Sequence, residues 1–445
     1  MNYVETRSKF VNYFENQGFK CLPRASMLHP SIPMSFVMSA GLVQIETSLN
    51  QNQIRFNDKY ILVQDCFRHF DLENVGKDDL HLSLFEMSGA FIFGHHKKEQ
   101  TINQIWQLTT EVYGIDKNRI WVTYFAGGKL GKHQLPSDEL TRQTWLNIGI
   151  SDKNLIGLGL DDNYWLQGVG GYTNDNMPRK CGPNTELFYD RGNGCGKHCQ
   201  PGCNCGRFIE FSNTLFISHA FNPQNQSLRL LSKPFVETVV GSERLTMILQ
   251  NKSSVFDIDD YKTIINTISM FKKPQGLSEK AIKTSERIIA DYLKALFVLI
   301  ADGAPPPGKG GRKRMMRILI RSFLSRQYIL RIQSRKFLPT IIDSIVNSLD
   351  NKYVESSEIK NRMIAYIEDE ELRFKQTLAK GQHEIESMIE QNKGETLTGS
   401  QILFLEKKLG LPNILTALIL KEKGYVFNEI AYQKYLTSWQ IKNTN

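Results

Sequence analysis

Residues 67–94 read FRHFDLENVGKDDLHLSLFEMSGAFIFG, and this stretch decides the fold class. It continues the β-rich run YILVQDC at residues 60–66, and Leu84–Phe93 is a second β-rich run that can return antiparallel to the first. The polar, glycine-containing residues between the two runs are typical of a turn. The stretch therefore predicts an antiparallel strand pair with Arg68 at the end of its first strand.

The pattern changes along the chain from strands to helices. Further strands are predicted at residues 119–125 (RIWVTYF) and 208–217 (FIEFSNTLFI), with helical patterns at the N-terminus and at residues 99–113. After about Asn251 we find no convincing strand. The helical patterns there cover residues 285–300, 312–332, 339–349 and 359–379, and GAPPPGKGG at 303–311 interrupts them. We expect an α+β chain: a mostly antiparallel sheet flanked by helices over residues 1–255, then an all-helical region over residues 256–445.

Composition and charge indicate which class of molecule the protein binds. The 445 residues allow two or three domains, and the net charge of +9 favours an anionic partner. Residues 309–336 hold no Asp or Glu, which favours nucleic-acid contact over a merely solvated helix face. The predicted RNA contacts there are Lys309, Arg312, Arg314, Arg317 and Arg321. We find neither a membrane-length apolar run nor a signal peptide, and we expect a cytoplasmic, monomeric protein without membrane contact.

Four cysteines, Cys195, Cys199, Cys203 and Cys205, crowd into residues 194–206 with the spacing C-x3-C-x3-C-x-C. Four thiolates on one short loop can close tetrahedrally around zinc, with His198 as a spare ligand. The alternative is a set of free thiols on a loop, which is uncommon at this density. We therefore predict a structural Zn²⁺ on a Cys-rich insert.

Two arginines are candidates for holding phosphate. Arg68 ends a strand, where its guanidinium can grip a phosphate bidentately. Gly241 precedes Glu243 and Arg244, which open an apolar helix, and Arg244 could sandwich an adenine against Phe85. Either arginine alone could equally be a surface residue or part of an ordinary helix start.

Several segments together resemble one family in the same order. The pair Phe67 and Arg68 resembles motif 2 of class II aminoacyl-tRNA synthetases, residues 241–244 resemble motif 3, and residues 71–94 are similar to the alanyl-tRNA synthetase signature. The match continues through Ser39 to Gly41 with Gln44, residues 162–165 (DNYW), 181–190 (CGPNTELFYD), 210–216 (EFSNTLF), 234–250, 256–259 (FDID) and 285–303. The resemblance is collinear over almost the whole chain.

The resemblance implies an ATP-dependent ligase. A small amino acid would be activated as its adenylate, with Mg²⁺ bound mainly through ATP, and transferred to a tRNA whose acceptor stem the helical region contacts. The catalytic residues would be Arg68 and Arg244. The implied ATP-binding residues are Arg68, Phe85, Met87, Glu243 and Arg244. The implied amino-acid-binding residues are Trp165, Asn213, Leu215, Glu237, Val239 and Gly241.

The chain also departs from the family pattern. Glu237 and Val239 stand where the family has an aspartate that grips the substrate ammonium and a glycine that leaves room for the alanine methyl. Only His69 and Phe70 remain of the hairpin loop after Arg68. The loop at residues 308–311 lacks the family's asparagines. Lys407, a further predicted RNA contact, replaces an aspartate that helps to read the G·U pair of alanine tRNA.

The matches to the family pattern and the departures from it leave three hypotheses about function. The first is a minimal alanine–tRNA ligase. The second is a paralogue that activates another small amino acid for a different tRNA or a biosynthetic acceptor, which Glu237, Val239 and Lys407 favour. The third is a non-catalytic RNA-binding or regulatory relative, which Arg68, Arg244, Asn213 and Trp165 disfavour. No pattern of an editing metal site is present, so we expect a form without editing and C-terminal domains.

Overall fold

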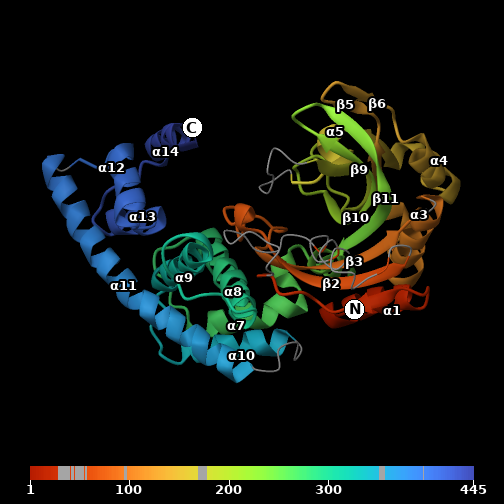
Figure 1. Cartoon of the computed structure of the whole chain (residues 1–445). Coiled ribbons are helices and arrows are strands. Elements are labelled where there is room, and N and C mark those ends of the chain that lie inside the picture. Colours follow the sequence, from red (N-terminus) through yellow and green to blue (C-terminus); the bar gives the residue numbers. More distant parts are fainter. Residues whose placement is uncertain are drawn as a thin grey trace. The chain divides into compact units, whose positions relative to one another are not determined.

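The computed structural model describes residues 1–28, 41, 45, 55, 58–94, 98–168, 178–349, 356–393 and 395–444. Their contacts divide the chain into two compact units, each of which is visible in Figure 1. The first, the sheet unit, takes in residues between Met1 and Asp260 other than Asn74–Asp78. The second, the helical unit, takes in Asn74–Asp78 and Tyr261–Asn445.

Nine strands of the described chain form one sheet, in the order β1-β2-β3-β11-β10-β9-β4-β7, with β8 paired to β9 beside this path. Only β1–β2 and β4–β7 pair in parallel, so the sheet is mostly antiparallel as predicted. The strands are β1 (Lys20–Leu22), β2 (Lys59–Phe67), β3 (Leu84–Phe93), β4 (Ile120–Phe125), β7 (Leu155–Leu158), β8 (Tyr164–Leu166), β9 (Arg179–Asp190), β10 (Phe208–Asn222) and β11 (Ser227–Gly241). A separate hairpin joins β5 (Gly128–Leu130) to β6 (His133–Leu135).

The central pair β2–β3 forms as the sequence predicts. Its register runs without interruption from the pair Lys59 and Ile92 to the pair Phe67 and Leu84. Apolar side chains on both strands are buried, because helices cover one face and a hydrophobic cluster that includes Leu62 lies on the other. The backbone N–H of Arg68 donates to Ser83 O at 2.9 Å, which closes the pair just beyond β2.

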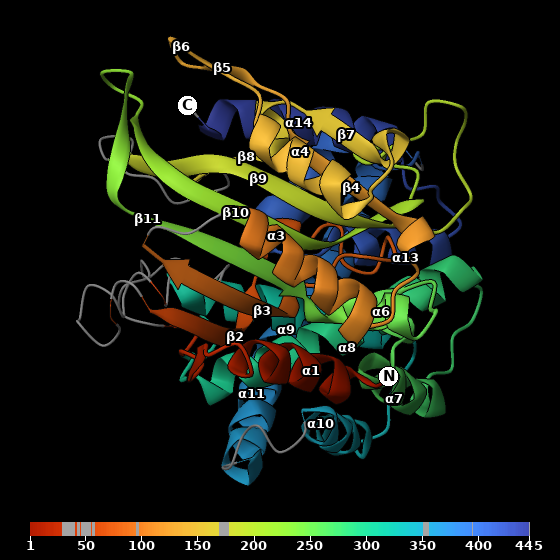
Figure 2. The ribbon, with the colours of Figure 1, turned by 90° about the vertical axis from the view of Figure 1, so that its right-hand side faces the viewer.

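Helices cover one face of the sheet. Figure 2 shows α1 (Tyr3–Glu15), α3 (Lys98–Gln107) and α4 (Glu139–Ile148) in front of the strands. α6 (Ser242–Leu249) joins this face through its Ser242 hydroxyl, which lies 3.1 Å from that of Ser88. Helix α1 begins with a capping box formed by Asn2 and Glu5. The opposite face carries the residues predicted to bind substrate.

Short helical segments complete the sheet unit. They are η1 (His69–Asp71), η2 (Leu108–Val112), η3 (Lys117–Arg119), η4 (Asp152–Asn154), α5 (Leu160–Asn163) and η5 (Val255–Asp257).

The helical unit contains no strand in the residues that the structure describes. Its helices are α7 (Asp259–Phe271), α8 (Glu279–Ala301), α9 (Gly311–Ile329), α10 (Phe337–Ser348), α11 (Ser356–Gln391), α12 (Gly399–Phe404), η6 (Leu405–Leu409), α13 (Asn413–Glu422) and α14 (Glu429–Thr444). Every residue of α8 from Ser285 to Ile300 is buried, so α8 forms the centre of the unit. No described helix has the length and apolar character needed to cross a membrane. The predicted α+β class is confirmed.

Candidate functional site

A pocket of about 280 Å³ lies where the central strands of the sheet end. It brings together most of the residues predicted to bind substrate: Arg68, Phe85, Met87, Asn213, Val239, Gly241, Glu243 and Arg244. Glu210, Phe211 and Ser212 also line it, although the sequence did not single them out individually. The polar residues that interrupt the apolar run of β10 (EFSN at 210–213) are the sequence signal that could have drawn attention to them.

Arg68 and Phe85 form one wall of this pocket. The guanidinium carbon of Arg68 lies 4.8 Å from the centroid of the Phe85 ring. From the sequence we expected this ring to pair with Arg244 about an adenine, whereas in the structure one face of the ring meets Arg68. The contact holds a cation over a π-surface in a polar pocket, which is a suitable arrangement for a planar base or a phosphate.

Arg244 lies at the start of α6 and faces β10. Its Nη1 lies 3.3 Å from both the backbone oxygen and Oε2 of Glu210. About 30% of the Arg244 side chain and 38% of the Glu210 side chain is exposed, so an entering anion can compete with this ion pair. The two pocket arginines therefore differ in their partners: Arg68 makes a cation–π contact with Phe85, and Arg244 makes an ion pair with Glu210.

Glu243 is a buried residue of the pocket wall. Its two carboxylate oxygens accept the backbone N–H of Glu86 at 3.0 and 3.1 Å, and Oε1 also accepts the hydroxyl of Tyr3 at 2.9 Å. These bonds tie α6 to β3 and α1. We interpret Glu243 as a residue that positions the pocket strands rather than one whose oxygens face ATP.

The predicted amino-acid-binding residues share one face of the sheet. Val239 lies opposite Asn213 on β10 and Gly89 on β3, and Glu237 lies opposite Leu215. Since residues two apart on a strand point to the same face, these side chains form two adjacent rows. Val239 and Asn213 reach the pocket wall, whereas the buried Glu237 and Leu215 do not line it.

Trp165 lies farther along the same face. It pairs with Gly182 between β8 and β9 and packs, partly buried, against the hydrophobic cluster that includes Leu215. The structure therefore places Trp165 beside the hydrophobic core and not among the residues that line the pocket.

Two polar residues of β9, Asn184 and Glu186, form hydrogen bonds with Asn213 on the neighbouring strand β10. The Asn213 amide nitrogen donates to Glu186 Oε1 at 2.8 Å, and the Asn184 amide nitrogen donates to Asn213 Oδ1 at 3.1 Å. Burial raises the pKa of Glu186 well above its ordinary value, and the negative charges of Glu210 and Asp162 raise it further. The three side chains fix the orientation of the Asn213 amide beside the pocket.

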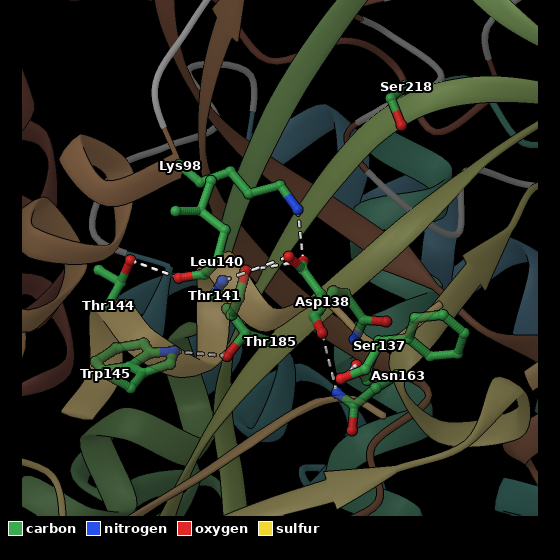
Figure 3. A network of polar contacts seen from close by, with 12 residues as sticks. Lys98, Ser137, Asp138, Leu140, Thr141, Thr144, Trp145, Asn163, Thr185 and Ser218 are labelled. Carbon is green, nitrogen blue, oxygen red and sulfur yellow. Dashed lines mark hydrogen bonds and ion pairs between the residues drawn. The ribbon is translucent and has the colours of Figure 1, made fainter. Parts of the chain in front are cut away.

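A hydrogen-bonded network on the covered face holds β9 in place (Figure 3). The Trp145 indole donates to Thr185 Oγ1 at 2.9 Å, and that hydroxyl donates to Thr123 O at 2.6 Å. The Asn163 amide donates to Thr123 Oγ1 at 2.9 Å. Since Thr185 points away from the open face, these bonds fix the strand position from which Asn184 and Glu186 reach that face.

The four clustered cysteines meet in space. Their sulfur atoms all lie within 4.8 Å of one another, with 3.3 Å between Cys195 and Cys203 and 3.4 Å between Cys199 and Cys205. Four sulfurs bound tetrahedrally at about 2.3 Å from zinc lie about 3.8 Å apart, so the donor set and its spacing fit zinc. The Arg207 backbone N–H and Cys199 lower the pKa of Cys205 to about 6, which favours the thiolate.

Arg207 fixes the base of this cysteine loop. Its Nε and Nη2 donate to the two carboxylate oxygens of Asp190, both at 2.6 Å. The Arg207 backbone oxygen accepts the N–H of Arg191 at 3.0 Å. The hydrogen bonds to Arg207 hold the pKa of Asp190 below its usual range.

The predicted RNA contacts in the helical unit have different surroundings. Lys309 and Arg314 are exposed, and Arg312 and Arg317 are half-buried. Arg321 differs, because its Nε donates at 2.6 Å to the fully buried Glu370. We therefore interpret Arg321 as the partner of a buried carboxylate rather than of an RNA phosphate.

Lys407 lies in η6, where its Nζ is 5.2 Å from the Trp439 ring centroid and 2.8 Å from Glu406 Oε1. Among the segments that resemble the family, Ser39 and Gln44 lie outside the described residues.

An antiparallel sheet with a two-arginine pocket at its strand ends, followed by a helical unit, has the architecture of a class II tRNA synthetase. The chain belongs to the family described as tRNA synthetases class II (A), whose model matches residues 5–444.

Two curated relatives are named alanine–tRNA ligase. Alanine–tRNA ligase from Thermoanaerobacter sp. (strain X514) is 31% identical over 98% of this chain and 48% of its own length. The enzyme of that name from Thermotoga sp. (strain RQ2) is 32% identical over 100% of this chain and 49% of its own length. The chain thus spans about half the length of the curated relatives it matches. A solved pyrrolysyl-tRNA synthetase from Desulfitobacterium hafniense covers 58% of this chain and 72% of its own, at 11% identity and a TM-score of 0.32, too low to support an argument.

Proposed function

We propose that this protein activates a small amino acid with ATP and transfers it to a tRNA. The observation that carries the proposal is the pocket that Arg68, Phe85 and Arg244 line together. The family to which the chain belongs, and relatives named alanine–tRNA ligase, support the same activity. The sheet unit would carry out the activation, and the helical unit would contact the RNA.

The proposed chemistry needs no protein nucleophile. A carboxylate oxygen of the amino acid attacks the α-phosphorus of ATP, and the bond to the β-phosphate oxygen breaks, so pyrophosphate leaves with the electron pair. A terminal hydroxyl of the tRNA then attacks the activated carbonyl carbon, and AMP leaves. Arg68 would contact the α-phosphate, and Arg244 would lie near the adenine and phosphates. The protein would therefore orient the substrates and stabilise negative charge.

Magnesium would enter with the nucleotide. Among the described residues, the carboxylates of Glu210 and Glu243 line the pocket, and Glu243 already accepts hydrogen bonds from Glu86 and Tyr3. Glu210, whose ion pair in the described part of the chain is with the partly exposed Arg244, is the carboxylate that can turn towards a phosphate-bound cation. Mg²⁺ would neutralise charge on the phosphate oxygens, and the ATP itself would supply most of its ligands.

The amino acid would be small. The side chain of Val239 occupies space at the pocket wall between Asn213 and the side-chain-free Gly89. The resemblance assigns ammonium binding to the position of Glu237, which is buried two residues before Val239. Substrates of the size of glycine, alanine or serine fit these constraints, and discrimination among them would be modest because a methylene is worth only about 1–3 kcal/mol.

The test is ATP–pyrophosphate exchange across all amino acids. We expect exchange with one or more small amino acids and a loss of about 100- to 1,000-fold in Arg68→Ala, since a single transition-state donor is typically worth that much. Arg142→Ala, which removes a partly exposed arginine of α4 that does not line the pocket, is the matched control and should retain activity. Undiminished exchange in Arg68→Ala, with Arg142→Ala also normal, would exclude the proposed phosphate contact.

A further inference from the structure

A second cationic surface lies on the sheet unit, away from the pocket. Three segments, residues 126–137, 178–182 and 217–236, hold six lysines and arginines and no Asp or Glu. We call Lys129, Lys132, Lys180 and Arg229 from these segments the hairpin basic surface. None of these four lines the pocket described above.

The strand register brings two of these cations onto one face. Lys180 on β9 is opposite Ala220 on β10, which is opposite Arg229 on β11. Directly opposed residues point to the same face, and two strand spacings separate the outer Cα atoms by about 10 Å. The small Ala220 side chain leaves room between the two cations. The Lys180 ammonium lies 5.6 Å from the centroid of the Phe235 ring, which holds this cation close to the face.

Two further cations come from the β5–β6 hairpin, which packs against the tip of the β10–β11 hairpin. His133 Nε2 lies 2.6 Å from Gln226 O. A Cβ atom added to Gly131 would lie 1.9 Å from Gln226 Oε1, so the turn that carries Lys132 is in direct contact with the tip. These contacts hold the turn of the β5–β6 hairpin against the tip of the β10–β11 hairpin, so the two lysines are attached to a preorganised support.

Three of the four cations of the hairpin basic surface have no ion pair among the described residues. In the part of the chain that the structure describes, Lys129, Lys132 and Arg229 are exposed and make no ion pair. The carboxylate that follows the β5–β6 hairpin is Asp138, and it already binds Lys98 at 2.5 Å and Thr141 at 2.8 Å (Figure 3). A set of exposed cations on one rigid support attracts a polyanion.

We infer that the hairpin basic surface binds the phosphodiester backbone of RNA, as a second contact beside the one expected from the helical unit. The inference rests on the proposed function for the identity of the polyanion. The helical unit has its own acid-free segment at residues 309–336, so each unit carries cations that a polyanion can neutralise. Contacts of this kind add affinity and salt dependence without base specificity.

The experiment compares RNA binding by the full chain and by Lys129→Gln/Lys132→Gln/Arg229→Gln. Unfractionated tRNA serves as the probe, titrated from about 50 to about 200 mM salt. We expect the variant to bind at least about 10-fold more weakly at the low end. The slope of log K against log salt should fall by roughly three units, one for each cation that no longer neutralises a phosphate.

The control variant removes the same charge from other elements of the same unit. It is Lys117→Gln/Lys153→Gln/Lys252→Gln, in which all three residues are exposed. The control should bind RNA with the affinity and salt slope of the unmodified chain. Equal weakening in both variants would mean that only overall charge matters, and the inference would be overturned. It would also be overturned if the hairpin variant lost binding to phosphatidylserine vesicles and kept binding to tRNA.

Pyrophosphate exchange separates this inference from the proposed function. The reaction needs no tRNA, so both triple variants should catalyse it like the unmodified chain. Normal exchange together with unchanged RNA binding in the hairpin variant would refute the inference and leave the proposed function in place. Absent exchange in the unmodified chain would refute the proposed function, and a selective loss of RNA binding in the hairpin variant would still support the surface.

Discussion

Replacing Val239 by alanine should widen the range of amino acids that the protein activates. Val239 is half-buried at the pocket wall, and its neighbour on β3, Gly89, has no side chain that could fill the space. The substitution removes two methyl-sized groups at about 0.8 kcal/mol each, so substrates larger by one or two carbons should gain about 1–2 kcal/mol, or roughly 5- to 30-fold in kcat/KM. Alanine is preferable to glycine, because two opposed glycines would weaken the strand pair by a further ~0.5–1 kcal/mol.

The assay is pyrophosphate exchange with glycine, alanine, serine, 2-aminobutyrate, valine and phenylalanine. Val240→Ala is the matched control, since Val240 is the next residue on the same strand and its buried side chain points to the covered face. The ratio of 2-aminobutyrate to alanine activation should rise in Val239→Ala and not in Val240→Ala. An unchanged ratio in Val239→Ala, or strong activation of phenylalanine by the unmodified protein, would show that Val239 does not limit the substrate.

Three further predictions concern other parts of the molecule. Elemental analysis should find one zinc per chain, and Cys199→Ser should lose it while the sheet unit stays folded; a metal-free, fully active chain would contradict the assignment. Asp190→Asn should lower the free energy of unfolding at pH 7 by about 1–3 kcal/mol, because the ionised carboxylate accepts two bonds from Arg207. Folding lowers the pKa of Asp190, so its stabilising contribution is fully present above the unfolded pKa of about 4. The contribution should vanish as the pH falls through the folded pKa, and denaturation curves at several pH values will show this loss. Arg314→Gln/Arg317→Gln should lower the salt slope of tRNA binding by roughly two units, and an unchanged slope would remove α9 from the RNA interface.

Much of the fold could be predicted from local patterns. The strands at residues 60–66 and Leu84–Phe93 alternate or run apolar over a length typical of strands, and a polar turn separates them. The helices of the second unit show apolar residues at helical spacing. By contrast, β9 and β11 escaped prediction, because each mixes apolar residues with polar and charged ones. Each also contains a proline, Pro183 in β9 and Pro234 in β11, which argues locally against a strand. Their strand form depends on pairing with distant segments, which a local pattern does not contain.

In the candidate site, too, some residues could be predicted from the sequence and others depend on tertiary contacts. The pocket position of Arg68 and Arg244 followed from motifs that place them at the end of a strand and the start of a helix, and that of Asn213 followed from a segment that resembles the family. Glu186 was missed, because its significance comes from a hydrogen bond to Asn213, which is 27 residues away in the chain. The partner of Arg321 was missed for the same reason, since Glu370 is 49 residues distant. Sequence spacing indicates which residues can do chemistry, and tertiary contacts decide which side chains are already engaged.

The bond between Tyr3 and Glu243 has a consequence for biosynthesis. The two residues are separated by 240 positions, and the same glutamate holds the strand N–H of Glu86 at the pocket. At a ribosomal rate of about 5–20 residues per second, helix α1 must wait about 10–50 s for this partner to emerge. During that interval the apolar surfaces of β2 and β3 lack α6, so chaperone binding to nascent chains should be strongest before residue 243 leaves the ribosome and should fall once it has.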